Sequence, residues 1–369
     1  MSVTTDQAVP GPSAARRPQG YLHGPVVDFL CLGGGSLPIL CLLLMLPPAE
    51  YRPSVMLTVF LASHVVNNPH FIHSYQIFYD GFGSKIAPGA VLRRRYLLAG
   101  VAVPLGMAGF FAWCLATGDA VLMGKAMNLM LLTVGWHYVK QGYGILIVES
   151  VMKRAFLDQR GKDWLRWNTF AVWIASWIWA NQAVREAELW GIQYFSLALP
   201  GWLLWLAAGA AAVTTLASVL VLARKAMAGP LPWNGVLAYV TSSYVWIVLV
   251  PTEPLLLAVV PVFHSLQYLA VVYRYQLNRS AVEDGPPVLG IPRPRFMVAK
   301  FAVAGIVLGF IAFWAMPVVL DAALAYREEI FGPTVFMFMF FTFINVHHYF
   351  LDNVMWRKEN PDIKEHLFK

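Results

Sequence analysis

The chain has 369 residues, of which 58% are hydrophobic and 13% are charged. Soluble domains carry about 25% charged residues, so this composition excludes an ordinary soluble globule and favours an integral-membrane protein. The formal net charge is +7, but the basic residues lie in short loops between apolar segments. Membrane topology and anionic lipid headgroups account for them there without nucleic acid.

The two ends of the chain differ from its middle. Residues 1–25 are polar, rich in Pro, Gly and Ser, and contain no apolar run, which is typical of a disordered tail and not of a cleaved signal peptide. We predict a transmembrane helical domain over 26–356 and a second cytoplasmic tail over 357–369. The three cysteines lie in apolar segments and form no CxxC pair, so neither a disulfide framework nor a cysteine metal site is expected.

Ten apolar segments approach the roughly 20 residues that a membrane helix needs. They cover residues 26–46, 54–76, 96–117, 121–148, 167–182, 200–223, 233–251, 254–274, 297–320 and 331–355. The predicted fold is therefore an all-α, polytopic membrane helix bundle of about ten transmembrane helices. Most of the 27 Lys and Arg residues fall on the side that holds both termini. Because positive charge marks the cytoplasmic side, we expect both termini to be cytoplasmic, in a bacterial inner membrane.

Seven of the nine histidines lie inside the second, fourth, eighth and tenth segments: His64, His70, His73, His137, His264, His347 and His348. Ionisable residues are rare within membranes and point to function. In the predicted topology all four segments run from outside to inside. At 1.5 Å of rise per residue, their histidines share one layer in the cytoplasmic half. Imidazoles from several helices at one depth are typical of a metal or haem site in a bundle.

The first histidine group occurs in SHVVNNPHFIHSYQIFYD, which contains His64, His70 and His73. His70 and His73 are one turn apart and share a face, whereas on a straight helix His64 points about 120° away from His70. Pro69 removes a backbone hydrogen bond, and a kink there can turn all three toward one centre. We predict all three as metal ligands; the alternative is that one of them packs at an interface.

Two further segments, GWHYVKQGYG and FHSLQY, each place a glutamine about one turn after a histidine. These pairs are His137 with Gln141 and His264 with Gln267. We predict both histidines as ligands, and both glutamines as hydrogen-bond partners for the second ring nitrogen, which metal-bound histidines usually require. The alternative is a neutral histidine that hydrogen-bonds across helices.

The last group, NVHHYFLDNVMWRK, contains His347 and His348, followed one turn later by Asp352. Adjacent helical residues diverge by about 100°, so the two rings can serve different metals, or one metal and a carboxylate. Neutral imidazoles around two divalent ions leave their charge uncompensated at the edge of hydrocarbon, which is costly. We therefore predict Asp352 and Asp80 as bridging or supporting carboxylates.

The density and depth of these histidines, with the HH pair and its nearby acid, resemble the histidine-rich integral-membrane non-haem di-iron enzymes. Those families include fatty-acid desaturases, hydroxylases and alkane hydroxylases. The chain departs from them because it has one HH pair in place of repeated HxxxH and HxxHH boxes, and more spans. Its scattered histidines are also similar to those of the bacterial membrane β-carotene cleavage dioxygenases, which are polytopic and bind one iron.

These patterns predict a membrane oxidoreductase with non-haem iron, two ions rather than one, that uses O₂ to hydroxylate, desaturate or cleave an apolar substrate. The expected partners are a lipid-like or isoprenoid substrate, the membrane, and a cytoplasmic electron donor such as a ferredoxin or reductase. Three alternatives stay open. They are a haem b-binding membrane protein, a zinc-dependent membrane hydrolase and a proton-coupled transporter.

Overall fold

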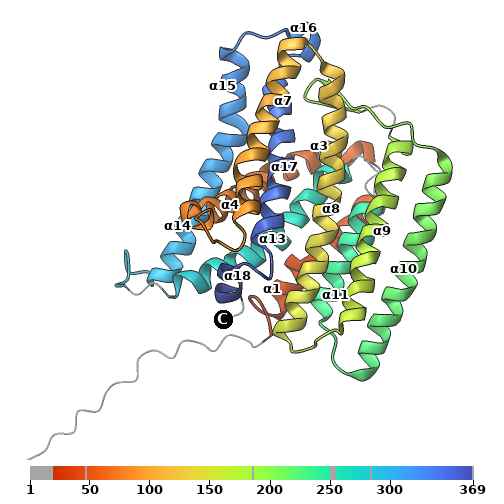
Figure 1. Cartoon of the computed structure of the whole chain (residues 1–369), viewed down its shortest axis with the longest axis vertical. Coiled ribbons are helices and arrows are strands. Elements are labelled where there is room, and N and C mark those ends of the chain that lie inside the picture. The colour runs from red at the N-terminus through yellow and green to blue at the C-terminus, as the bar shows by residue number, and fades with distance from the viewer. Residues whose placement is uncertain (1–19, 46–47, 185–186, 250–254, 283–284, 368–369) are drawn as a thin grey trace, which may run out of the picture.

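The computed structural model describes residues 20–45, 48–184, 187–249, 255–282 and 285–367 (Figure 1). Residues 1–19 of the predicted amino-terminal tail lie outside this part of the chain. With η for π-helical turns, the elements are α1 (Pro25–Phe29), η1 (Leu30–Gly34), α2 (Ser36–Met45), α3 (Pro48–Val65), α4 (Asn67–Tyr79), α5 (Phe82–Lys85), α6 (Arg93–Leu97), η2 (Leu98–Ala102), α7 (Val103–Thr117), α8 (Ala120–Met152), α9 (Gln159–Ala183), β1 (Glu188–Leu189), β2 (Ile192–Gln193), α10 (Gly201–Ala228), α11 (Trp233–Val240), η3 (Thr241–Trp246), α12 (Ile247–Leu249), α13 (Leu256–Ser280), α14 (Arg293–Phe310), η5 (Ile311–Ala315), α15 (Met316–Ala323), α16 (Glu328–Phe331), α17 (Val335–Met355) and α18 (Pro361–His366).

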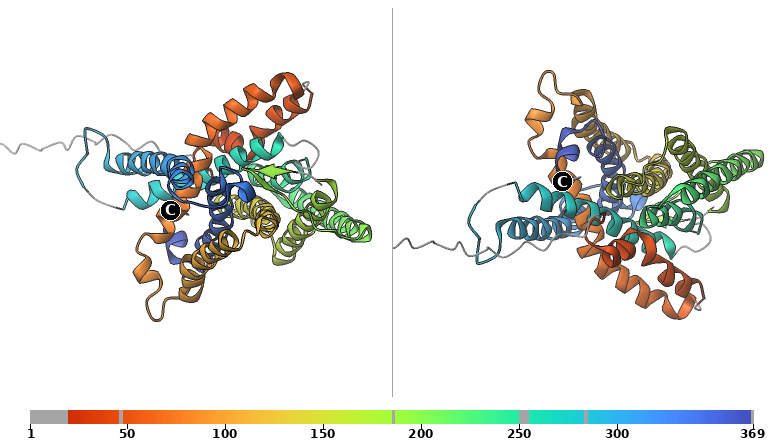
Figure 2. Two further views of the ribbon diagram at one scale, coloured as in Figure 1. Left: turned by 90° about the horizontal axis from the view of Figure 1, so that it is seen from above. Right: turned by 90° about the horizontal axis from the view of Figure 1, so that it is seen from below.

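The all-α prediction is confirmed: apart from one antiparallel ribbon of two short strands and an isolated bridge between Val288 and Ile291, the described secondary structure is helical. The ribbon pairs Glu188 with Gln193 and Leu189 with Ile192. Its two-residue turn contains Gly191 at φ +84°, a left-handed conformation that glycine adopts at little cost. The view from above in Figure 2 shows this ribbon at one end of the helix bundle.

Six described helices, some of them continuing through a π-helical turn, are long and apolar enough to cross a membrane. They cover Arg52–Tyr79, Arg93–Thr117, Gly201–Ala228, Leu256–Ser280, Arg293–Ala323 and Val335–Met355. A seventh span results if the pair Pro25–Gly34 and Ser36–Met45, bent by 42°, is one broken span. The described helices thus indicate a multi-pass membrane protein with six or seven spans. Ten spans and the cytoplasmic placement of both termini stay predictions.

The predicted spans outside this set coincide with less apolar or broken helices. Segment 121–148 lies in α8, which carries polar residues such as Asn128, Lys140 and Gln141. Segment 167–182 lies in the Trp-rich α9. The described part of the next segment, 233–249, is divided among α11, η3 and α12, and residues 250–251 lie outside the described residues. Polar side chains lower the hydropathy of a span without preventing a long helix, since helix length depends on backbone hydrogen bonds.

Four helices, α4, α8, α13 and α17, meet in the middle of the bundle. In the views of Figure 2, α17 lies among α4, α7 and α8, all of which it contacts. One apolar cluster below the centre joins α4, α13 and α17 through Phe78, Tyr268 and Leu351. A second one joins α8 and α17 through Met127 and Phe338. Because α17 takes part in both clusters, the two clusters together fix how the four helices are aligned along the bundle.

Candidate metal centre

Four histidines from four helices converge in the interior: His70 on α4, His137 on α8, His264 on α13 and His348 on α17. Each offers one ring nitrogen, and these nitrogens lie within 4.8 Å of one another. We call these residues the four-histidine cluster. An ion bound at about 2.0–2.1 Å from each nitrogen would bring the four nitrogens to within roughly 4 Å of one another. The largest separation in the cluster would have to shorten by about 1 Å for all four to bind.

The cluster is buried, and its ring nitrogens lack the partners that buried polar atoms normally have. The exposed fraction is 8% for His137 and 1% for each of the other three. Within the described residues, both nitrogens of His70, both of His264 and Nδ1 of His348 have no hydrogen-bond partner. An unpaired buried polar atom costs roughly 1–3 kcal/mol. A divalent ion would accept one lone pair from each of the four rings, which would satisfy the nitrogens that face the centre, so the donor set fits a metal.

The contact between His348 and His137 brings two further ring nitrogens to the centre of the cluster. Their Nε2 atoms face each other at 3.1 Å. Two unprotonated nitrogens cannot hydrogen-bond, so without a metal one ring must carry its proton on Nε2. His70 also meets His348 edge to face, with ring centroids 4.4 Å apart, and His264 at 5.1 Å. The rings thus surround one point instead of stacking in a row.

Asp352 adjoins the cluster from α17. Its Oδ1 accepts hydrogen bonds from Ser74 Oγ at 3.1 Å and from Tyr268 OH at 3.2 Å. Its Oδ2 lies 3.5 Å from His348 Nε2 and 3.7 Å from His137 Nε2. The carboxylate is therefore held by one oxygen and faces two prospective ligands with the other, where its charge would offset that of a bound cation.

Gln141 and Gln267 lie beside the cluster, but they do not form the hydrogen bonds to imidazole nitrogens that we predicted from the sequence. Gln141 Nε2 donates to the carbonyl of His264 at 2.9 Å and to Gln267 Oε1 at 3.0 Å, and Gln267 Nε2 donates to the carbonyl of Leu32 at 2.7 Å. Within the described part of the chain these amides tie α8, α13 and η1 together. They do not bond to the imidazole nitrogens.

His64 and His73 lie outside the four-histidine cluster. The Nδ1 of His64 pairs with the carbonyl of Phe60 at 2.8 Å, and its ring stacks at 10° to Trp314. The Nδ1 of His73 lies 2.7 Å from Gln76 Oε1. The helix is interrupted between Val65 and Asn67, yet this break does not turn all three histidines of the segment to one centre.

His347 and Asp80 are also held elsewhere. The two ring nitrogens of His347 pair with Tyr75 OH at 2.7 Å and with the carbonyl of Ala99 at 2.8 Å. Asp80 forms an ion pair with Arg279. The structure thus brings four of the seven predicted histidines together and gives the other three separate partners.

Ser74 and Tyr138 are neighbours of the cluster that the sequence reasoning missed, and Tyr268, the tyrosine of FHSLQY, received no role in it. Ser74 and Tyr268 each follow a cluster histidine by four residues, so helical spacing alone places them on the same face. Tyr138 stacks on His264, with ring centroids 4.0 Å apart. Nothing in the sequence indicates that contact, because it depends on how α8 packs against α13.

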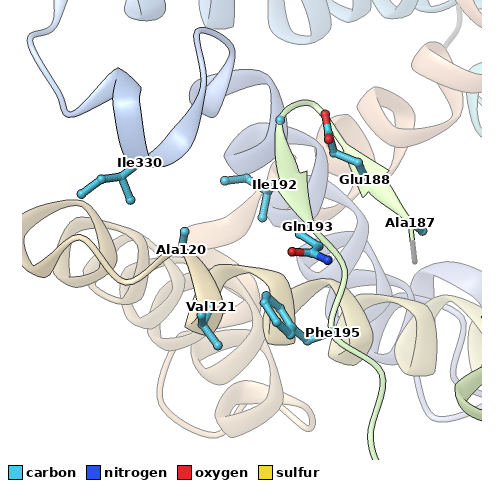
Figure 3. A pocket seen from close by; sticks show the side chains of 9 residues that line it. Ala120, Val121, Ala187, Glu188, Ile192, Gln193, Phe195 and Ile330 are labelled. Atoms are coloured by element: carbon cyan, nitrogen blue, oxygen red, sulfur yellow. The ribbon is translucent and has the colours of Figure 1, made fainter. Parts of the chain in front are cut away.

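A hollow of about 660 Å³ lies at the far end of α8, beside the ribbon (Figure 3). Its walls include Ala120, Ile192, Gln193 and the carboxylate residue Glu188. Ala120 precedes His137 by about 25 Å of helix, at 1.5 Å per residue. This hollow is therefore separate from the candidate metal centre.

No family model, curated protein or solved structure matches this chain. The candidate metal centre therefore rests on the geometry of its own residues. The described structure is that of a helical protein with six or seven candidate membrane spans. It contains a buried group of four histidines that can bind a metal ion. Among the described residues it is the one group of three or more His, Cys, Asp or Glu side chains arranged in this way.

Proposed function

We propose that the protein is a membrane oxidoreductase that holds one non-haem iron ion through His70, His137, His264 and His348. The observation that carries this proposal is the convergence of four buried imidazoles from four helices. Five of their ring nitrogens have no partner among the described residues. The bound iron would supply activation of O₂ for the oxidation of an apolar substrate.

One ion fits these residues better than the two that the sequence favours. The three histidines outside the cluster are engaged with Phe60, Gln76, Tyr75 and Ala99, so a second ion would have to displace those contacts. The arrangement is therefore more similar to that of the membrane β-carotene cleavage dioxygenases, which bind one iron through histidines on separate helices, than to that of the di-iron enzymes.

The number of ligands favours iron over zinc. Imidazole suits zinc, copper, iron and nickel alike. Zinc in proteins is almost always tetrahedral, so four histidines would complete its coordination, whereas catalytic zinc sites keep one position for water. Iron accepts further ligands, so four histidines leave positions for O₂ and substrate. A four-histidine iron site is therefore the arrangement that allows chemistry.

The same geometry argues against haem. The two axial nitrogens of a haem lie on opposite sides of the porphyrin plane. Here four imidazole nitrogens lie within 4.8 Å of one another, so at least two of them would occupy the space of the macrocycle.

The protein's own residues would position the ion and exclude water from it. Asp352, anchored by Ser74 and Tyr268, would offset its charge. Because the cluster lies among apolar helices, the substrate we propose is lipid-like or isoprenoid and arrives from the bilayer. A cytoplasmic electron donor belongs to this proposal for hydroxylation or desaturation; a cleavage that inserts both atoms of O₂ requires none.

Metal analysis and an absorption spectrum of the purified full chain test this proposal. We expect about one iron per chain and no intense Soret band. His347→Ala and His348→Ala form a matched pair of neighbouring variants. We expect His348→Ala to lose iron and His347→Ala to retain it, because His347 bonds to Tyr75 and Ala99 instead. Stoichiometric zinc, a Soret band or an iron-free protein would each contradict the proposal.

A further inference from the structure

A groove of about 520 Å³ lies between α7, α8 and α17. Its volume is within the range of about 300–1,000 Å³ that is typical of small-molecule sites. The walls are largely apolar and include Ala102, Gly106, Phe110, Leu129, Val346 and Phe350. We call it the α7–α8–α17 groove. An apolar chain would fit such walls without leaving polar atoms unpaired.

Two polar groups interrupt these walls, Lys125 on α8 and Thr342 on α17. Lys125 is exposed and forms no ion pair with any described residue. Thr342 is 1% exposed, and its Oγ1 has no hydrogen-bond partner in the described part of the chain. A helical threonine can satisfy its hydroxyl on the carbonyl four residues earlier. Thr342 lines the groove, so a rotation of its side chain would present this unpartnered hydroxyl to an occupant.

The register of α8 and α17 sets the distance between the two groups along the bundle. His137 lies against His348, and Lys140 Nζ donates to Asn353 Oδ1 at 2.5 Å. This register puts Lys125 about five residues nearer than Thr342 to the ribbon end of the bundle, which is roughly 7 Å of helical rise. Val346 and Phe350 extend the groove beyond Thr342, away from the ribbon end of the bundle.

The groove is distinct from the four-histidine cluster. At 100° per residue, Val346 and Phe350 each point about 160° away from His348 around α17. They therefore line the opposite face of the helix, and an occupant of the groove would not reach the candidate metal centre.

We propose that the α7–α8–α17 groove binds an anionic phospholipid from the surrounding bilayer. Its phosphate would pair with the Lys125 ammonium, an ester carbonyl would accept a hydrogen bond from Thr342, and one acyl chain would lie along Val346 and Phe350. Basic side chains near a membrane surface attract anionic headgroups. A phospholipid carries a second acceptor deeper than its phosphate, whereas a fatty acid has one polar group and would satisfy Lys125 or Thr342, but not both.

Native mass spectrometry of the full chain in detergent, with phosphatidylglycerol or phosphatidylcholine added, tests the headgroup contact. We expect preferential retention of phosphatidylglycerol. Lys125→Gln should weaken its binding about fivefold, the effect of one basic residue at an anionic surface. The matched control is Lys300→Gln, which removes an exposed lysine on α14 and should change nothing. Equal retention of both lipids by the wild-type chain, or an unchanged preference in Lys125→Gln, would overturn the proposal.

Two glycines of α7 test the groove itself. A Cβ added at Gly106 or at Gly109 would meet no described atom within 4 Å, so both positions accept a larger side chain. Gly106 lines the groove and Gly109 is not among its lining residues. Gly106→Leu should fill the groove and reduce phosphatidylglycerol retention to background, while Gly109→Leu should retain it. The thermal unfolding midpoint of each variant in detergent reports that it folds, and equal retention by the two would show that the lipid binds elsewhere.

Discussion

The two carboxylate oxygens of Asp352 have different surroundings. Oδ1 is fixed by the hydroxyls of Ser74 and Tyr268, while Oδ2 faces the Nε2 atoms of His137 and His348. A buried anion beside four neutral rings is costly without a cation. The same anion becomes favourable once an ion is bound, so Asp352 is expected to act mainly on metal affinity.

Asp352→Asn removes this charge and preserves the shape of the side chain. We expect the affinity for iron to fall about 10–100-fold, as is typical when a group that supports metal ligands is lost. Titration of the metal-free protein with Fe(II) under anaerobic conditions measures the change. Asp80→Asn is the control, because Asp80 pairs with Arg279. Similar affinities for the two variants would remove Asp352 from the site.

Which histidines converge could be predicted only in part from the sequence. His137 and His264 are single histidines in their helices, so the pattern identified them directly. Choosing between His347 and His348, or among His64, His70 and His73, requires the rotation of each helix about its axis. That rotation is set by packing against neighbouring helices, which a single sequence does not display.

At the scale of elements, the interruption between α3 and α4 orients His70. Pro69 has no amide hydrogen, so the carbonyl of Val65 loses its normal helical donor. The chain departs from helical geometry at Val66, with φ −122° and ψ −62°, and α4 begins at Asn67. His70 is in the first turn of α4, so its direction depends on this break.

Pro69→Ala should restore the missing hydrogen bond and continue α3 into α4. We expect His70 to rotate away from the other three rings and iron affinity to fall about tenfold, comparable to the loss of a ligand-orienting group. Pro53→Ala is the matched control, since Pro53 also lies inside a helix but far from the cluster in sequence. Titration of both variants with iron measures this change in affinity. An unchanged affinity in Pro69→Ala would show that the break between α3 and α4 does not set the ligand geometry.

Helices were easier to predict than spans. The apolar runs identified the long helices, including α8 and α9, because apolar content and helix formation coincide in a membrane protein. Hydropathy alone does not separate a lipid-facing helix from one that presents Asn128, Lys140 and Gln141 to neighbouring helices. The difference between ten predicted spans and six or seven supported ones arises at α8 and α9, and at the segment that is divided among α11, η3 and α12.

At the scale of the whole molecule, the candidate ion would connect four helices that are far apart in sequence. Ligand binding to the folded state stabilises a protein by about 4 kcal/mol at a concentration one thousand times the Kd. Removal of metal with a chelator should therefore lower the thermal unfolding midpoint of the full chain in detergent by roughly 5–10 °C. The midpoint of His348→Ala should not respond to the chelator. A chelator-insensitive wild-type midpoint would argue against a bound ion.

The order of the four ligands along the chain bears on biogenesis. His70 enters the membrane early during synthesis, whereas His348 arrives on α17, after every other helix of the cluster has been made. If translation stops between α13 and α17, the polypeptide contains only three of the four histidines of the cluster. An ion that needs all four ligands, as we propose, would therefore bind only after α17 has been inserted, and its presence would report that the helices have assembled.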